Sequence, residues 1–420
     1  KTTIGFGSPN KAGTSGVHGS PLGEDEIEIT RKNLGWTYDP FHIPKEIYSE
    51  WNMEEQGNDL NNQWNELMQE YKASYPDEFS ELDRIIKGKL PDGYEESFKE
   101  FLESLLDGEQ RNIATRKASE ICLNFFCDKL PELIGGSADL TGSNNTFSTF
   151  STELLPENPL GNHIFYGARE FGMTAMMNGM LLHGGIRPYG GTFLVFMDYA
   201  RNAVRLASLM EIPNIFVYTH DSIGLGQDGP THQPVEHLVT LRATPNLNNW
   251  RPADVIETAV AWNESITSSK TPHSLILSRQ ALPFIKRTKS QIKEINKGGY
   301  LLAEQDEANI TLIASGSELQ LILGVANELE KGGIKANIVS MPCLDKFYTQ
   351  EDDYKARVIK PDLPKLVVEA LHPASWYGLI NLQDKVIGID SFGESAPAPE
   401  LMKKFGFTQE NILEVAKTLI

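Results

Sequence analysis

Residues 309–342 read NITLIASGSELQLILGVANELEKGGIKANIVSMP, and this stretch decides the fold class. A short apolar run, ITLIA, precedes a segment whose apolar residues recur at helical spacing, and a second run, ANIVS, follows it. Gly332 and Gly333 mark the expected helix end, while Ser317 with Gln320 matches a capping box near its start. Two strands joined by one helix form a βαβ unit, which predicts a parallel sheet.

The same alternation occupies the region from about 110 to 288. The expected strands are PELIGGSADL, NIFVYTHD and HSLILSRQ, and helical segments such as ATRKASEICLNFFCDKL and FLVFMDYARNAVRLASLM lie between them. The sequence therefore predicts an α/β protein whose largely parallel sheets carry helices on both faces.

The region before residue 100 differs from the rest. It opens with a Gly/Ser-rich loop at 5–23 and continues into a polar, helix-favouring stretch at 54–90. Trp64, Leu67 and Tyr71 recur there at helical spacing, which predicts one apolar stripe on an otherwise solvated helix. Residues 91–110 are typical of a linker with a short helix.

Bulk properties exclude several classes of protein. A chain of 420 residues is too long for one ordinary core. The net charge of −19 argues against a general binder of nucleic acids or membrane surfaces, since both are polyanions. No run approaches the roughly 20 apolar residues of a membrane span. Three cysteines without metal-ligand spacing suit a reducing cytosol.

Residues 219–234, THDSIGLGQDGPTHQP, gather polar groups directly after the apolar run NIFVY. Ligands of parallel sheets bind beyond the carboxyl ends of the strands, and this loop lies at such an end. His220 and His232 flank Asp228, and imidazoles suit hydroxyl recognition and proton transfer near neutral pH. Two histidines twelve residues apart are weak evidence for a metal, and no G-x-S-x-G motif indicates a serine hydrolase. A hydrogen-bonded turn explains either histidine alone, but the whole loop favours a functional site.

Glu170 opens the segment EFGMTAMMNGMLLHGG, an almost wholly apolar helix that we expect to be buried. An ionised carboxylate on a buried helix is costly unless it is paired, which favours a functional role. An exposed glutamate that favours the helix start, or an ion pair with Arg169, remains an alternative. Phe193, Phe196 and Tyr199 recur three residues apart and would form an aromatic face on a helix, which is more often core than cofactor contact.

Three further residues lie at breaks between expected elements: Arg116, Ser143 and Arg279. A guanidinium fork and a hydroxyl match phosphate oxygens, although each residue alone is more often a surface residue or part of a structural ion pair. His18 is a lone histidine in the glycine-rich loop.

Together these stretches closely resemble the transketolase family of thiamine diphosphate enzymes, over essentially the whole chain. The matching strings are TIGFGSPNKAGTSGVHGSPLG, ELIGGSADLTGSN, YGAREFGM, PYGGTFLVFMDYARNAVRLA, THDSIGLGQDGPTHQPVEHL, SRQALP, SGSELQLIL and GIDSFGESAPAPELMKKFGFT. The resemblance implies a thiamine-diphosphate-binding fold plus a C-terminal α/β domain. It also implies a cytoplasmic homodimer of the pentose phosphate pathway, with Mg²⁺ or Ca²⁺. The reaction implied is transfer of a two-carbon ketol unit from a ketose phosphate, such as xylulose 5-phosphate, to an aldose phosphate, such as ribose 5-phosphate.

The resemblance also implies roles for individual residues. Glu170 matches the glutamate at the pyrimidine N1′, and His232 and His18 match candidates for proton transfer, so these three are the catalytic candidates. The implied cofactor-binding residues are His18, Asp139, Leu140, Glu170, Phe193, Phe196 and Tyr199, with Phe196 as the stacking ring. The implied substrate-binding residues are His18, Arg116, Ser143, His220, Asp228, His232 and Arg279. Phe171 stands where many relatives carry histidine, which puts only a secondary contact in doubt.

One family motif does not occur in these 420 residues: the G-D-G sequence that, with a later asparagine, binds the metal and the diphosphate. The first residue is also not methionine. We therefore expect a fragment that lacks most of the N-terminal diphosphate-binding domain, holds no metal ligand and is inactive alone. The expected division is a diphosphate-domain tail with linker at 1–100, a pyrimidine-binding domain at 101–288 and a C-terminal domain at 289–420.

Alternative functions remain open at this point. Dihydroxyacetone synthase and deoxyxylulose-phosphate synthase are related enzymes, although DGPTHQP together with THDSIG favours transketolase over the latter. A non-catalytic subunit that needs a partner chain is the alternative from another class.

Overall fold

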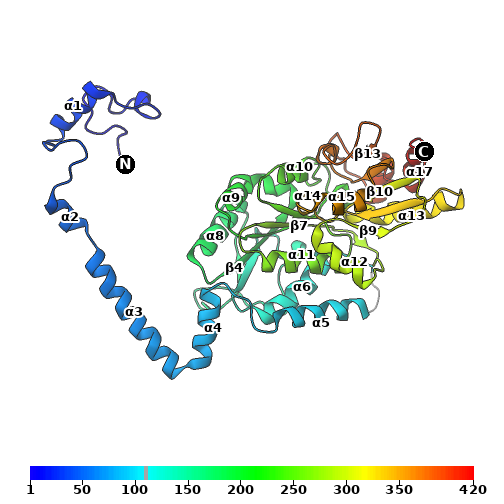
Figure 1. The fold of residues 1–420 in the computed structure, drawn as a ribbon, viewed down its shortest axis with the longest axis horizontal. Coiled ribbons are helices and arrows are strands. Elements are labelled where there is room, and N and C mark those ends of the chain that lie inside the picture. Colours follow the sequence, from blue (N-terminus) through cyan, green and yellow to red (C-terminus); the bar gives the residue numbers. More distant parts are fainter. Residues whose placement is uncertain (108–111) are drawn as a thin grey trace. The chain divides into compact units, whose positions relative to one another are not determined.

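The structure is a computed structural model that describes residues 1–107 and 112–420. The chain divides into two compact units, Lys1–Ser80 and Glu81–Ile420, which we describe separately (Figure 1). Within the described residues, no helix has the length and apolar character needed to cross a membrane.

The first unit is helical and has little interior. Its elements are η1 (Ser15–Val17), α1 (Glu24–Asn33), α2 (Lys45–Trp51), α3 (Glu54–Ser74) and the start of α4 (Pro76–Ile86). Its glycine-rich loop is fixed by polar contacts, because Glu26 accepts hydrogen bonds from Ser8 Oγ and from the backbone N–H of Asn10. Helix α3 has the expected apolar stripe, but none of its residues is buried.

The second unit contains a six-stranded sheet in the order β3-β2-β4-β5-β7-β6, and every pair in it is parallel. Its strands are β2 (Leu133–Ser137), β3 (His163–Phe165), β4 (Arg187–Phe193), β5 (Ile215–Thr219), β6 (Asn248–Trp250) and β7 (His273–Leu277). This sheet confirms the prediction of a parallel α/β fold. Parallel strands end at one edge of a sheet, so the loops after β2, β4, β5 and β7 meet there.

Helices cover both faces of this sheet, as predicted. They are α5 (Tyr94–Asp107), α6 (Thr115–Lys129), α7 (Thr141–Asn144), α8 (Glu170–His183), α9 (Met197–Leu209), α10 (His237–Arg242) and α11 (Val255–Thr267). Ile215 and Val217 of β5 belong to the cluster that contains α6 and α11 residues. Phe216 and Tyr218 point to the opposite cluster, with α8 and α9. The alternation along β5 is that of a strand buried on both faces.

A second sheet follows, in the order β13-β12-β10-β11-β9, and only β9 runs antiparallel. Its strands are β9 (Tyr300–Ala303), β10 (Ile310–Ala314), β11 (Ala336–Ser340), β12 (Lys365–Val368) and β13 (Lys385–Ile387). Its helices are α12 (Lys289–Glu294), α13 (Leu319–Lys331), α14 (Leu344–Tyr348), α15 (Asp352–Ile359), α16 (Ala398–Lys404) and α17 (Gln409–Lys417). The short strands β1 (Ile113–Ala114) and β8 (Ala281–Leu282) pair antiparallel. Because Trp262 of α11 and Leu312 of β10 share one buried cluster, the two sheets have a continuous core.

Three local expectations were wrong. No capping box forms at α13, because Ser317 Oγ donates to the Glu318 carboxylate at 2.6 Å instead of accepting from the helix. Phe193 is not helical but ends β4, and α9 begins only at Met197. The short helix expected within the linker at 91–110 does form, as α5 at 94–107, but it packs on the core, so the assignment of these residues to a linker was wrong.

Helix α8 is also less buried than expected. Met173 and Met177 pack inward, whereas Phe171, Met176 and Leu182 are exposed. The outer face of α8 is apolar, and the described residues of the unit Glu81–Ile420 do not cover it.

Candidate active site

The candidate residues gather at the carboxyl edge of the six-stranded sheet. Ala138–Leu140 follow β2, Phe193 ends β4, His220 follows β5 and Arg279 lies two residues after β7. A parallel α/β sheet positions ligand-binding side chains at this edge. The topology therefore brings together residues as far apart in the sequence as Ala138 and Arg279.

One cavity of about 470 Å³ opens at this edge. Its lining consists of Ala138, Asp139, Leu140, Ala168, Glu170, Phe196 and Tyr199. Five of these seven were candidates from the sequence, and Ala138 and Ala168 were not. Glu170 is half-buried at the first position of α8 and contributes a carboxylate to an otherwise mainly apolar wall. A wall that is largely apolar, with the carboxyl groups of Glu170 and Asp139 as its charged groups, suits a flat heteroaromatic ring.

The aromatic residues form a stack although they do not share a helix. Phe193 and Phe196 lie parallel with ring centroids 5.6 Å apart, and Tyr199 is 6.0 Å from Phe196. The stack continues to His220, whose ring lies 3.7 Å from Phe193, and to His232, 5.4 Å edge-on from Phe196. The β4-to-α9 turn thus joins the cavity to the polar loop at 219–234.

His220 is held in an unusual backbone conformation at φ +61°. Its Nδ1 lies 2.8 Å from Thr219 Oγ1, which donates to Asn144 Oδ1 at 2.7 Å. Asn144 in turn donates to Ser137 Oγ at 3.1 Å, so β2, α7 and β5 all fix this histidine. Left-handed backbone at a non-glycine residue persists only where the surroundings enforce it. Thr219 and Asn144 were missed because side chains that act through another residue leave no motif.

Two arginines adjoin His220 without carboxylate partners in the described residues. Arg116 Nη1 donates to the Ser143 carbonyl at 2.6 Å, and Arg279 Nη1 donates to the Leu225 carbonyl at 3.0 Å. Burial, together with the charge of Arg279, lowers the pKa of Arg116. Burial and the charges of Arg116 and Arg279 lower the pKa of His220 to about 3. Uncompensated positive charge beside a neutral imidazole favours an anionic ligand.

The remaining candidates lie in different settings. His232 is half-buried, with Nδ1 2.9 Å from Thr231 Oγ1, and Asp228 is exposed in the same loop. Ser143 is half-buried in α7 and takes part through its carbonyl. His18 is exposed at the end of η1 in the unit Lys1–Ser80, so it is described apart from the others.

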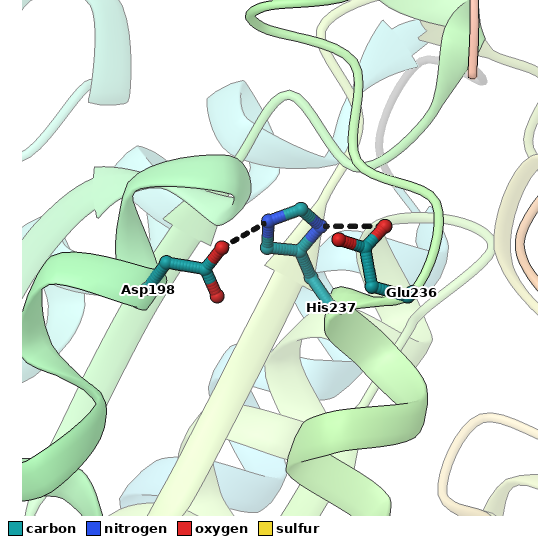
Figure 2. Close-up of side chains that lie close together, drawn as sticks. All are labelled: Asp198, Glu236 and His237. Carbon is teal, nitrogen blue, oxygen red and sulfur yellow. Dashed lines mark hydrogen bonds and ion pairs between the residues drawn. The ribbon is translucent and has the colours of Figure 1, made fainter.

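A second cluster, not expected from the sequence, joins α9 to α10 (Figure 2). The buried His237 has Nε2 3.1 Å from Asp198 Oδ2 and Nδ1 3.9 Å from Glu236 Oε2. Both carboxylates are exposed. Since exposed acidic groups often surround a histidine without an ion, this geometry alone does not identify a metal site.

A larger cavity of about 530 Å³ lies elsewhere in the second unit, between residues 85–90 and 184–187. It contains none of the candidate residues, and its buried Glu132 is already paired with Arg84 at 2.9 Å. We place the candidate site at the smaller cavity, because the ring stack joins its Phe196 through Phe193 to His220, whose pKa the neighbouring arginines lower.

Family models match three successive parts of the chain. Residues 1–91 match "Transketolase, thiamine diphosphate binding domain", 111–285 match "Transketolase, pyrimidine binding domain" and 298–408 match "Transketolase-like TK C-terminal domain". The first match contradicts the expectation of a fragment that lacks most of the diphosphate-binding domain.

Curated proteins and solved structures agree with these matches. Transketolase 2 of Vibrio parahaemolyticus is 49% identical over 422 residues, covering 100% of this chain and 64% of that protein. Transketolase of Buchnera aphidicola is 50% identical over 421 residues, covering 100% and 63%. A mutant transketolase of Pichia stipitis crystallised with xylulose 5-phosphate has a TM-score of 0.91 at 41% identity, covering 100% and 62%. The chain thus spans somewhat less than two thirds of the length of the relatives it matches.

Proposed function

This chain belongs to the transketolase family, and we propose that it serves transfer of a two-carbon ketol unit between sugar phosphates with thiamine diphosphate as cofactor. The donor would be a ketose phosphate such as xylulose 5-phosphate and the acceptor an aldose phosphate such as ribose 5-phosphate, as in the pentose phosphate pathway. The observation that carries the proposal is the cavity lined by Glu170 and Phe196. The stacked rings of Phe193 and His220 join it to two arginines that have no carboxylate partner among the described residues.

Glu170 and the aromatic residues suit the pyrimidine ring of the cofactor. In our proposal, the Phe196 ring stacks on the pyrimidine, and Tyr199, Asp139 and Leu140 complete the wall that the cavity presents. The Glu170 carboxyl group shares a proton with a nitrogen of the pyrimidine ring, which holds that proton between the carboxyl group and the ring. Phe193 supports Phe196 from the sheet side at 5.6 Å. When bound, thiamine diphosphate supplies the carbanion chemistry of ketol transfer.

The two arginines near His220 suit the phosphate group of the sugar. Arg116 and Arg279 have N–H groups beyond their single carbonyl contacts, and Ser143 and His220 lie beside them. We propose that these four residues bind the substrate phosphate. His232 and Asp228 would contact sugar hydroxyls, and His232 and His18 are the proposed sites of proton transfer at the reacting carbons.

Replacement of Glu170 by glutamine tests the proposal. The whole chain, supplied with thiamine diphosphate and Mg²⁺, should convert xylulose 5-phosphate and ribose 5-phosphate, and E170Q should lose about 100-fold or more of that rate. Asp198→Asn is the matched control, because Asp198 lies between Phe196 and Tyr199 in the sequence but does not line the cavity. An E170Q variant as active as D198N, or a wild-type chain without turnover, would contradict the proposal.

We also propose Mg²⁺ as the accompanying metal, for which no ligand in this chain is assigned. Loss of turnover on treatment with EDTA and recovery with Mg²⁺ are expected.

The three cysteines are free and buried, which supports a cytoplasmic location that cell fractionation would test. The division at about residues 100 and 288 remains our proposed domain assignment, and separate expression of 289–420 would test its second boundary.

We propose a homodimer formed through α8 and α9. The exposed apolar residues of these two adjacent helices are Phe171, Met176, Leu182, Leu206 and Leu209. Large apolar side chains exposed on two neighbouring helices favour an interaction site in a soluble protein. Sedimentation of the purified chain tests the assignment, since a monomer at micromolar concentration would contradict it.

A further inference from the structure

The substrate loop, residues 220–235, has an irregular shape that its own backbone hydrogen bonds do not fix. His220, Gly226 and Gly229 have φ values of +61°, +90° and +81°. The backbone hydrogen bonds within the loop form short turns, such as Gly226 N–H to the Ile223 carbonyl at 3.1 Å. Loops of this kind keep one conformation only when the surroundings determine it.

The C-terminal domain, proposed at residues 289–420 and matched by the family model over 298–408, supplies contacts to residues 226–233 of this loop. Gln233 Nε2 donates to the Gly226 carbonyl at 2.8 Å and to the Glu394 carbonyl at 2.9 Å, so one side chain closes the loop and ties it to this domain. Ser395 Oγ donates to the Gln227 carbonyl at 2.6 Å. These bonds therefore anchor the part of the loop that lies farthest along the chain from β5, residues 226–233.

At the near end, the anchor is the guanidinium of Arg251, which is fully buried. Its Nε donates to Asp221 Oδ2 at 3.0 Å, and Asp221 directly follows His220. Its Nη1 donates to the Ser315 carbonyl at 3.0 Å and to the Glu318 carboxylate, both in the C-terminal domain. One planar fork thus connects the residue after His220 to the 3₁₀ turn η5 (Gly316–Glu318).

The charges make this connection strong. Burial alone would lower the pKa of Arg251, but the charges of Glu318 and Asp221 raise it above its ordinary value. Removal of one partner from a buried ion pair leaves an uncompensated charge, which is costly in a low-dielectric interior. The backbone leaves room for the fork: a Cβ at Gly316, whose φ is +54°, would meet Arg251 Cζ at 2.8 Å.

We propose that the C-terminal domain holds the substrate loop in its binding shape, and that Arg251 is the positioning residue through which it acts on His220. This inference rests on the proposed function, in which His220 contacts substrate. Without the fork, Asp221 would move toward water, and His220 would leave its stack on Phe193, where the ring centroids lie 3.7 Å apart.

Glu318→Gln in the full chain is the test, because it keeps the shape of the side chain and removes the charge. Glu257→Gln is a closely matched control. Glu257 is also fully buried, accepts from Arg287 at 3.1 Å and from Ser340 Oγ at 2.6 Å, and connects the same two domains away from the substrate loop. Amide hydrogen exchange over residues 215–235 measures the loop directly and needs no turnover.

We expect exchange in this segment to accelerate about tenfold in E318Q and to stay at the wild-type rate in E257Q. The proposal would be overturned if the amides of this segment exchanged equally slowly in E318Q and wild type. It would also be overturned if E318Q and E257Q lost protection from exchange to the same extent. If E318Q does not fold, Ser395→Ala replaces it, since the exposed Ser395 contributes one bond to the loop. A smaller acceleration confined to residues near 227 is then expected, and unchanged exchange there overturns the proposal.

A kinetic readout separates positioning from general stability. In the chain supplied with cofactor, E318Q should raise KM for the sugar phosphate about fivefold or more over E257Q, with a smaller change in kcat. Absence of turnover in the wild-type chain would count against the proposed function, whereas the exchange result would still decide whether Arg251 positions the loop.

Discussion

The two compact units contain helices of the same kind but pack them differently. In α13 of the second unit, Leu319, Ile322 and Val325 recur at helical spacing and are buried against the sheet. In α3 of the first unit, Trp64 and Leu67 recur in the same way, yet more than half of each is exposed. Periodicity therefore predicts that a helix forms, but not that this chain offers a surface to cover it.

The largest expected consequence is a difference in resistance to proteolysis. Among the described residues of Lys1–Ser80, the buried ones are Ser8, Glu26, Thr30 and Pro44, and none of them is a large apolar residue. Local opening costs little free energy where few apolar contacts are lost. We expect chymotrypsin to cleave this unit about 100-fold or more faster than Glu81–Ile420, as measured by mass spectrometry of the products.

A time course would reveal whether the contrast holds. The expected product is a resistant fragment that begins between residues 75 and 95 and extends to Ile420. Early cleavage on both sides of residue 80 at similar rates would show that the first unit is as well packed as the second.

A matched pair of tryptophans sharpens the comparison residue by residue. Trp262 in α11 is fully buried and donates from Nε1 to Ser119 Oγ at 2.8 Å, whereas Trp64 in α3 is 53% exposed. Trp262→Ala should lower the free energy of unfolding by about 3–5 kcal/mol through lost contacts and a cavity. Trp64→Ala should change it by less than about 0.5 kcal/mol. Urea unfolding of both variants measures this, and similar costs at the two positions would contradict the contrast.

The sequence was sufficient for the fold where signals are local. Alternating apolar runs and helical periods predicted β10, α13 and β11, because each period depends on neighbouring residues only. Periodicity could not predict that the outer face of α8 is exposed, since apolar residues facing a core and facing a partner have the same spacing. The capping box failed because Ser317 bonds to Glu318, which is itself held by Arg251 from another domain.

In the candidate site, too, the residues with local sequence signals could be predicted, and those that depend on contacts in space could not. The polar loop after β5 and the glutamate at the start of α8 were recognisable, because unusual residue types follow or open regular elements. The link from Arg251 to Asp221 was not, since it depends on which strand ends become neighbours in space. Asn144 and Thr219 likewise support His220 through contacts that no sequence spacing encodes.

The smallest expected effect is the dependence of folding stability on pH that comes from the fully buried His273 of the second unit. Burial lowers the pKa of His273 to about 3, from 6.5 for an unperturbed side chain, and its Nδ1 accepts a hydrogen bond from Trp250 Nε1 at 3.1 Å. Between these two values the unfolded chain binds a proton that the folded chain excludes. This contribution to stability is therefore fully present above about pH 6.5 and is lost as the pH falls toward 3.

At pH 5 the loss amounts to about 2 kcal/mol for this one histidine. His273→Gln should remove that part of the pH dependence, because glutamine fills a similar volume without titrating. Urea unfolding of wild type and H273Q at pH 7.5 and pH 5 measures the difference, and we expect the wild-type protein to lose about 2 kcal/mol more than the variant on acidification. Parallel losses in the two proteins would mean that His273 already binds a proton in the folded state. Burial in the second unit would then be less complete than the contrast with the first unit requires.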